Sequence, residues 1–391
     1  MKIKIVLFLI LHFATVILLF SQEKDFKCID EKGNVLFEFK ARFVWPFSND
    51  MALFKTTVPD ETNTKLVWRA GFINGAGEVV IPAIYDSKYS TYYGFVDGVS
   101  WIRNPGEEYF YLIDKSGVRI SEKTYAKVGS FNEGMCAVYE DDKMGFINSS
   151  GVEVIPCKYI GDSWFYDGLV CVMDADAKEE QFGFINKNGD IVIPFQFYQA
   201  GYSGFVNGEA RVVINGKTCL INLAGEVVFT PLLTNNCDNF YDGLSLAYVN
   251  PDRSGFGFYD RNSQWVVEPI YDHVTSFKGG RSIVEKDGKL GVIDTTGKYI
   301  VPIEYVNVYG DCESHGLFIA VKDNISYFFN CDGEHFTDKD VKYIFGSNSG
   351  QLHPFSSKNG KMGYLRKDGS VFIEAIYINT EPFSEGKAWV Y

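Results

Sequence analysis

The sequence lacks the short motifs that mark many enzymes and metal proteins. It contains no Cys-x-x-Cys pair, no His-Glu-x-x-His spacing, no Gly-x-Ser-x-Gly elbow and no phosphate-binding Gly-x-x-x-x-Gly-Lys loop. Histidine is also rare, with five residues in a chain of 391. These absences argue against a zinc ribbon, a zinc protease, a serine hydrolase and a P-loop protein. We therefore expect a protein without enzymatic activity, metal or cofactor.

Basic residues are too few to balance the acidic ones. The chain has 37 Lys and Arg against 50 Asp and Glu, which gives a formal net charge of -13. A surface of this sign repels the phosphate backbone of DNA and RNA. We expect no nucleic-acid partner, and solubility is the simplest role of the charge.

A long apolar run occurs at the N-terminus. Lys2 and Lys4 precede the run Ile5–Phe20, and Ser21 offers a small residue before Gln22. This pattern resembles a secretory signal peptide over residues 1–21, which leaves residues 22–391 as the mature array. The alternative is an uncleaved membrane anchor. Cleavage is favoured, and it predicts an exported protein, periplasmic or at the cell surface or extracellular, with no membrane span after signal removal.

The eight cysteines leave two alternatives open. An even number in an exported chain permits disulfides. Cys136 and Cys171, however, occupy strand positions where other copies of the repeat carry small or aliphatic residues. The favoured interpretation for these two is a buried thiol that packs as a small hydrophobic group.

A tandem repeat organises the whole chain. The phrase GFINKNGDIVIP, from Gly183, returns as GFINSSGVEVIP from Gly145, as GFINGAGEVVIP from Gly71 and as GVIDTTGKYIVP from Gly291. Ten copies are marked by the residue that opens the turn of this phrase: Asp30, Asn74, Asp114, Asn148, Asn186, Asn222, Asp260, Asp294, Asn330 and Arg366. Glycine follows three residues later in each copy except the seventh, which has Ser263.

The spacing within each copy predicts antiparallel strands. Asn or Asp can accept hydrogen bonds from backbone amides two residues on, and glycine can take the left-handed conformation that closes the hairpin. The proline that follows, as at Pro82, Pro156, Pro194 and Pro302, is expected to end the strand. A second phrase, such as FVNGEARVVI from Phe205, adds an alternating strand. Each copy is therefore expected to be a three-stranded antiparallel unit, with a link that can hold a fourth short strand.

These two phrases together resemble the WG repeat family, also met as KWG repeats. The resemblance covers nearly all of the chain after the signal segment, and it implies a non-enzymatic protein. The tryptophan that names the family is replaced in six copies, by Ala70, Met144, Phe182, Phe256, Leu290 and Met362. Any function that depends on that tryptophan is therefore in doubt.

The two ends of the mature chain are in matching phase. Phe26–Asp30 reads as the second strand of a hairpin, and Ala388–Val390 reads as its missing first strand. Their pairing, with Lys27 opposite Trp389 as the first register to test, would complete one unit from both termini. We expect an all-β, β-propeller-like closed ring; the alternative is an open β-solenoid or superhelix.

Aromatic residues supply the candidate binding groups. The candidates lie near the links between copies: Tyr92, Tyr93, Trp164, Tyr166 and Tyr241. Exposed rings of this kind can anchor a protein partner or stack on sugars, although the same rings can also belong to the β core. The sequence predicts a non-catalytic scaffold of the bacterial cell envelope that binds a protein. The alternative is a module that binds a glycan or a cell-wall polymer.

Three stretches depart from the repeat pattern. Val58–Trp68 lengthens one hairpin, Asp174–Gln181 adds an acidic loop, and Glu334–His353 has lost most of the repeat signal. The acidic loop carries oxygen ligands that calcium prefers, but it lacks the ligand order of an EF-hand, so a solvated loop is favoured. Insertions in a repeat array map to loops on one face and are often functional.

Overall fold

The structure is a computed structural model. It describes residues 23–88, 94–162, 164–176, 180–198, 200, 204–232, 234, 236–250, 252, 254–323, 325–336, 341–345 and 352–391. The regular elements in these residues are β-strands, and their pairings are antiparallel. Over the same ranges, no helix has the length and apolar character needed to cross a membrane. The expected signal segment, residues 1–21, lies outside the described residues.

The chain divides into two compact units, each described here by itself. Unit 1 holds the described residues up to 108, residues 112–119 and residues 377–391; unit 2 holds residues 109–111 and 120–376. The first strands in chain order, and the last, are β1 (Lys24–Asp30), β2 (Val35–Ala41), β3 (Phe43–Val44), β4 (Met51–Pro59), β5 (Leu66–Asn74), β6 (Val79–Asp86), β7 (Val99–Ile102), β8 (Tyr111–Asp114) and β35 (Lys387–Val390). They form the sheets β2-β1-β35, β3-β4-β5-β6 and β7-β8.

Unit 2 repeats the same antiparallel order. Its strands are β9 (Lys127–Asn132), β10 (Met135–Glu140), β11 (Lys143–Asn148), β12 (Glu153–Ile160), β13 (Leu169–Asp174), β14 (Phe182–Asn186), β15 (Ile191–Phe197), β16 (Glu209–Ile214), β17 (Lys217–Asn222), β18 (Val227–Phe229), β19 (Phe240–Tyr241), β20 (Leu244–Tyr248), β21 (Phe256–Tyr259), β22 (Trp265–Tyr271), β23 (His273–Val274), β24 (Arg281–Lys286), β25 (Lys289–Asp294), β26 (Tyr299–Tyr305), β27 (Asn307–Asp311), β28 (Leu317–Lys322), β29 (Ile325–Asn330), β30 (His335–Phe336), β31 (Val341–Ile344), β32 (Leu352–Ser357), β33 (Met362–Arg366) and β34 (Val371–Tyr377). Several copies form a four-stranded sheet, such as β19-β20-β21-β22 and β23-β24-β25-β26. The short first strand of each such sheet comes from the link, as expected. The prediction of an all-β fold built from propeller-like repeated antiparallel sheets is confirmed.

The hairpin turn behaves as its residues predict. In the copy marked by Asn186, the side-chain oxygen of Asn186 accepts two hydrogen bonds. The donors are the backbone N–H groups of Asn188, at 2.9 Å, and Asp190, at 3.0 Å. Gly189 has φ +85°, and a Cβ placed there would lie 3.3 Å from Ile155 in the preceding copy. Glycine is therefore favoured here by the left-handed backbone, and the tight contact between copies adds to that preference. Ser263, the exception, also has a left-handed φ, of 58°.

The prediction that proline ends the outer strand is wrong. β6 continues through Pro82 to Asp86, and β15 continues through Pro194. The ladder between β5 and β6 shifts register on both sides of Phe72, so the proline falls at an irregularity where its missing N–H is tolerated. A Cβ on Gly71 would lie 2.6 Å from the carbonyl oxygen of Ile81, which explains the glycine that opens the repeated phrase.

A second set of turns connects neighbouring copies. The turn that precedes each alternating strand places an acidic or amide residue and a glycine at positive φ, as at Asp167 and Gly168. Asp167 then accepts the backbone amide of Gly208 in the next copy, at 2.7 Å. The carboxylate of Asp242 likewise accepts a hydrogen bond from the backbone N–H of Gly280, at 2.8 Å. The acid of this motif is thus a structural acceptor that ties one copy to the next.

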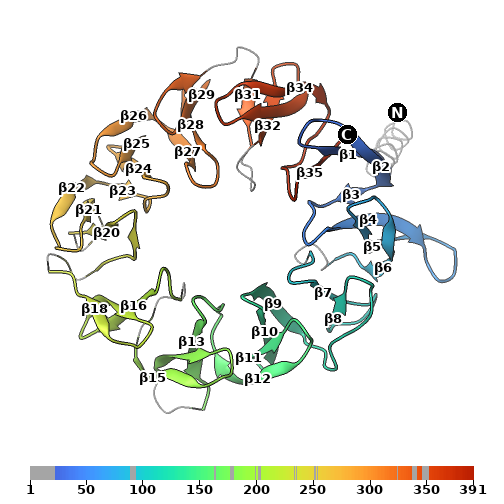
Figure 1. The fold of residues 1–391 in the computed structure, drawn as a ribbon, viewed down its shortest axis with the longest axis horizontal. Coiled ribbons are helices and arrows are strands. Elements are labelled where there is room, and N and C mark those ends of the chain that lie inside the picture. Colours follow the sequence, from blue (N-terminus) through green and yellow to red (C-terminus); the bar gives the residue numbers. More distant parts are fainter. Residues whose placement is uncertain are drawn as a thin grey trace, which may run out of the picture. The chain divides into compact units, whose positions relative to one another are not determined.

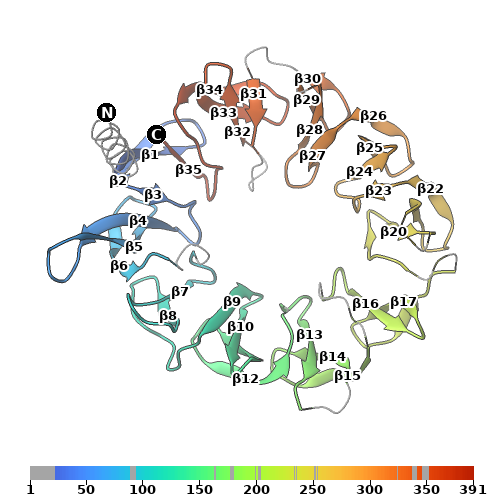
Figure 2. The same ribbon diagram turned by 180° about the vertical axis from the view of Figure 1, so that it is seen from behind.

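The two ends of the chain pair in one sheet of unit 1. β1 and β35 lie side by side in Figure 1 and, seen from behind, in Figure 2. Lys27 lies opposite Val390 and Cys28 opposite Trp389. The expected pairing of the termini is confirmed, while the register that put Lys27 opposite Trp389 is wrong by one residue. The expected closed ring requires this pairing.

Candidate functional site

The aromatic residues singled out by sequence do not form one site. Tyr92 and Tyr93 lie outside the described residues. Trp164 and Tyr166 are 38% and 37% exposed, at the turn before β13. Tyr241, on β19, is half-buried and packs against the core of its own sheet. Within the part of the chain that the structure describes, no ring contact joins Tyr241 to the other two.

A different group of aromatic residues forms a surface in unit 1. Antiparallel register places Phe43 opposite Lys55, Trp68 opposite Thr57, and Leu66 opposite Pro59, so Phe43, Trp68 and Leu66 share one face of the sheet. Phe43 is 50% exposed, Trp68 38% and Leu66 65%. Phe43 and Trp68 have ring centroids 5.8 Å apart. We call Phe43, Trp45, Leu66 and Trp68 the β3–β5 aromatic surface.

Two cations lie beneath these rings. The guanidinium carbon of Arg42 lies 4.8 Å from the ring centroid of Trp68, and the ammonium nitrogen of Lys55 lies 5.0 Å from that of Trp45. Both basic residues are buried. Burial lowers the pKa of Lys55, and the negative charge of Asp86 partly opposes that effect. The cation–π contacts hold the two indole rings in place, more strongly than at an exposed site.

The β3–β5 aromatic surface contacts the core of the sheet β2-β1-β35. The indole nitrogen of Trp389, on β35, donates to the backbone oxygen of Trp45 at 2.9 Å. Trp389 is itself buried and stacks on Phe47, with ring centroids 5.5 Å apart. Sequence reasoning missed the surface, although the lengthened hairpin Val58–Trp68 was the signal that pointed to it.

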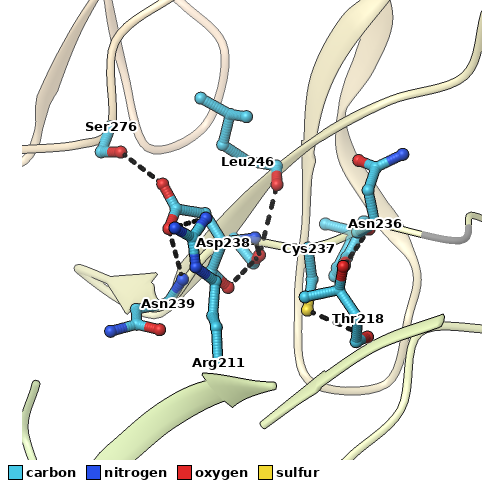
Figure 3. A network of polar contacts seen from close by, with 10 residues as sticks. Arg211, Thr218, Asn236, Cys237, Asp238, Asn239, Leu246 and Ser276 are labelled. Carbon is cyan, nitrogen blue, oxygen red and sulfur yellow. Dashed lines mark hydrogen bonds and ion pairs between the residues drawn. The ribbon is translucent and has the colours of Figure 1, made fainter. Parts of the chain in front are cut away.

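Unit 2 contains a polar pocket of about 380 Å³ between β16 and β20. Arg211 reaches Asp238 with an N–O distance of 3.0 Å, and Ser276 donates to the other oxygen of Asp238 at 3.2 Å, as Figure 3 shows. Burial raises the pKa of Tyr241; the charge of Asp238 adds to this rise and that of Arg211 opposes it. Tyr241 therefore belongs to the electrostatic surroundings of this ion pair.

The pocket offers hydrogen-bonding groups rather than an activated nucleophile. Burial raises the pKa of the Cys237 thiol to about 12, and its sulfur lies 3.5 Å from the carbonyl oxygen of Thr218. The side-chain amide of Asn236 makes two hydrogen bonds to the backbone of Tyr248. Its nitrogen donates to the carbonyl oxygen at 2.9 Å, and its oxygen accepts from the N–H at 3.1 Å. Over the described ranges of the chain, no group of three or more His, Cys, Asp and Glu side chains is placed to hold a metal ion.

The sequence left disulfides and buried thiols open as alternatives for the cysteines, and the structure contains both. Cys136 and Cys171 keep buried thiols, as expected. Cys312 and Cys331 form a disulfide, with Cα atoms 5.7 Å apart. In the acidic loop, Asp176 accepts from Lys143 at 2.9 Å and its side chain is largely exposed. This agrees with a solvated loop for the described part of that stretch.

Solved structures offer only distant likenesses. A eukaryotic initiation factor is similar at a TM-score of 0.45 and 10% identity, over 94% of this chain and 98% of that one. BamB from Moraxella catarrhalis has a TM-score of 0.33 and 12% identity, over 82% and 99% of the two chains. Apo AztD from Citrobacter koseri has a TM-score of 0.30 and 12% identity, over 95% and 99%. TM-scores below 0.5 carry no inference about this chain. No curated protein matches the sequence.

The family comparison gives a clear result. The model described as WG containing repeat matches residues 28–56, 71–106, 112–143, 144–159, 182–217, 256–289, 291–324 and 362–391. These segments cover well over half of the sequence, and each contains part of the hairpin and turn pattern described above. The chain therefore belongs to the WG-containing-repeat family.

Proposed function

We propose that this chain is a non-catalytic binding protein of the bacterial cell envelope, and that its β3–β5 aromatic surface holds a partner protein. The repeated β fold is consistent with a binding or scaffold role. The observation that carries the proposal is the joint exposure of Phe43, Trp68 and Leu66 on one sheet face. Residues of this kind supply most of the binding energy in protein interfaces when they are buried by a partner.

The rings are also pre-organised for binding. Arg42 packs under Trp68, and Trp389 fixes the backbone of Trp45, so both indoles are held before a partner arrives. Side chains that are already ordered lose less entropy on association. The occupant that suits this surface is a folded protein with apolar or aromatic side chains that fit against Trp68 and Phe43.

A site-specific photo-crosslinker tests this proposal in the native envelope. We expect a crosslinker at Leu66, which is 65% exposed, to capture one discrete protein species. The Trp68→Ala change should reduce that product about tenfold or more, since hot-spot truncations typically cost 2 kcal/mol or more. A crosslinker at Tyr343, which is 52% exposed in unit 2, is the matched control and should not capture the same species.

Three results of the crosslinking experiment would contradict the proposal. If the Leu66 and Tyr343 positions give the same products, or if Trp68→Ala leaves the Leu66 product unchanged, the surface does not select a protein. Recovery of carbohydrate instead of protein at Leu66 would also refute it.

The polar pocket of unit 2 favours a second candidate function, the binding of a glycan. Its observation is the ion pair of Arg211 and Asp238 in a pocket that Tyr248 also lines. Together these side chains can donate to hydroxyls, accept from them and stack on a sugar face. Soluble cell-wall oligosaccharides are the probe. Binding measured by calorimetry should be lost in Arg211→Gln and retained in Trp68→Ala. The opposite pattern, or no binding by the unaltered chain, would refute the glycan function.

A further inference from the structure

A second cavity of unit 2 lies apart from the polar pocket. It has a volume of about 190 Å³ and is lined by the hairpin β27–β28, the end of β31 and β32. Leu317, Ile319 and Ile344 supply aliphatic walls, and His315 and His353 supply imidazoles. This combination of a mostly apolar space with two imidazoles has no counterpart in the aromatic surface or the polar pocket.

In most other copies, small residues fill the position that His353 occupies; Val170 and Phe318 are the larger exceptions. It lies opposite Leu365 in its hairpin. The residues at the same register in other hairpins include Ala52, Ala210, Ser245, Ser282 and Ala388. The side chains of Ser245 and Ser282 donate to the carbonyl oxygen seven residues earlier, at 2.8 and 2.6 Å. Phe318 shows that a ring fits at this register, but that ring is apolar, so the departure at His353 is the polarity of the side chain.

The ring of His353 is buried without a partner. It is 0% exposed, and among the described residues neither ring nitrogen has a hydrogen bond. Burial lowers its pKa to about 4, and the nearby charges of His315 and Lys367 add to that effect. The ring is thus neutral at physiological pH, with one N–H donor and one acceptor nitrogen. Buried polar groups left in this condition are costly and call for an explanation.

The second imidazole is held at the cavity by covalent and polar anchors. Nδ1 of His315 lies 3.0 Å from a carboxylate oxygen of Asp311, which leaves Nε2 for another partner. The loop between these two residues also contains Cys312, whose disulfide to Cys331 ties it to the next hairpin. The wall that carries His315 is therefore fixed before any ligand enters.

We propose that this cavity binds a small, neutral molecule built on one aromatic ring that carries a hydroxyl group, with the hydroxyl bonded to His353. A cavity of 150 Å³ accommodates benzene, so about 190 Å³ has room for one ring and a substituent. The aliphatic walls suit the ring. A hydroxyl both donates and accepts, and so it can satisfy either free nitrogen of the imidazole.

The surroundings of the cavity select a neutral ligand. The charges around the cavity are of both signs: Asp311 lies 3.0 Å from His315 and offsets its charge, and Lys367 acts on His353 from outside the cavity lining. An anion such as benzoate would have to lose its hydration against the aliphatic walls. A cation would have to lose its hydration against the aliphatic walls. Phenol is the simplest probe that meets the requirements of size, polarity and charge.

Binding of phenol, benzene and benzoate to the mature chain tests the proposal by ligand-observed NMR. We expect phenol to bind about tenfold more tightly than benzene, which corresponds to one hydrogen bond, and benzoate to bind more weakly than phenol. His353→Ser, which introduces the residue found at Ser245 and Ser282, should abolish the preference for phenol over benzene. The matched control is His273→Ser, at an exposed histidine on β23, and it should leave the preference intact.

A second readout does not depend on the folding of a variant. In the unaltered chain, saturating phenol should shift the ring resonances of His353 and leave those of His273 in place. The proposal is overturned if phenol does not bind, if benzene binds equally well, if His353→Ser keeps the preference, or if the His353 resonances do not move. None of these outcomes bears on crosslinking at Leu66, so this inference and the proposed function fail separately.

Discussion

Replacing His353 with serine should make the stability of unit 2 less sensitive to acid. In an unfolded chain this histidine would titrate near 6.5, whereas in the folded chain its pKa is about 4. Between those pH values the unfolded state binds more protons than the folded state. The free energy of unfolding therefore falls as the pH falls through this range, and serine at the same position removes that contribution.

The size of the effect follows from the two pKa values. Relative to His353→Ser, the unaltered chain should lose about 2 kcal/mol between pH 7 and pH 5, and about 3 kcal/mol by pH 4. Burial is the main cause of the lowered pKa, and the charges that add to it come from two other elements, His315 on the β27–β28 loop and Lys367 after β33. Loss of side-chain volume changes the stability of the variant at every pH equally, so only the slope with pH isolates the imidazole.

Urea unfolding at pH 7, 6 and 5, followed by far-ultraviolet circular dichroism, measures that slope. His273→Ser is the matched control, because it makes the same substitution at an exposed histidine on β23 of the same unit. A constant difference between His353→Ser and the unaltered chain from pH 7 to pH 5 would refute the reasoning. It would mean that His353 is solvated or protonated in the folded chain.

Four further predictions address the fold and its processing. Gly189→Val should cost about 1–3 kcal/mol of unfolding free energy, because φ is +85° and the new side chain meets Ile155; unchanged stability would show that the turn relaxes. Asp167→Ala should cost about 1–2 kcal/mol and Asp167→Asn much less, since asparagine keeps an acceptor for the neighbouring amide; equal losses would contradict the role of that bond. With the native cysteines replaced, cysteines at Lys27 and Val390 should form a disulfide faster than cysteines at Lys27 and Trp389, and the reverse order would show a different register. Mass spectrometry of the native protein should find a chain that begins near Gln22, and an intact Met1 in the membrane fraction would indicate an anchor.

The hairpins were predictable because their determinants are local. Asn186 and Gly189 lie three residues apart, and the hydrogen bonds that they make close within the same turn. The acidic residue in the turn before each alternating strand, such as Asp167, was visible in the sequence, but its hydrogen bond to the next copy was not. Asp167 bonds to Gly208, 41 residues away, and no spacing rule within one copy identifies that partner.

The candidate sites depended on information that a single sequence does not contain. Phe43 and Trp68 meet because two ladders place them on the same face, and a shift of one residue would move either side chain to the other face. His353 lay in a stretch with little repeat signal, so its register opposite Leu365 appeared only in the folded chain. The sequence indicated insertions at both places, but it could not show which side chains they expose or bury.

The sheet that joins the two termini also constrains the order of events during synthesis. β1 leaves the ribosome long before β35, because Lys387, the first residue of β35, lies 357 residues after Asp30, the last residue of β1. At about 5–20 residues per second, roughly 20–80 seconds separate the two strands. Throughout that interval the backbone of β1 lacks one of its partners, and pairing between ends so distant in sequence is slow to form.

A chain that lacks β35 is therefore distinguishable from one that contains it. It would lack Trp389, whose indole lies against Phe26 and Phe37 at centroid distances of 6.3 and 5.6 Å. Those rings would be exposed beside an open strand edge, which is the kind of surface that chaperones and proteases recognise. Residues 387–390 thus serve as a check on the synthesis of everything that precedes them, because the sheet β2-β1-β35 cannot close until β35 has been made.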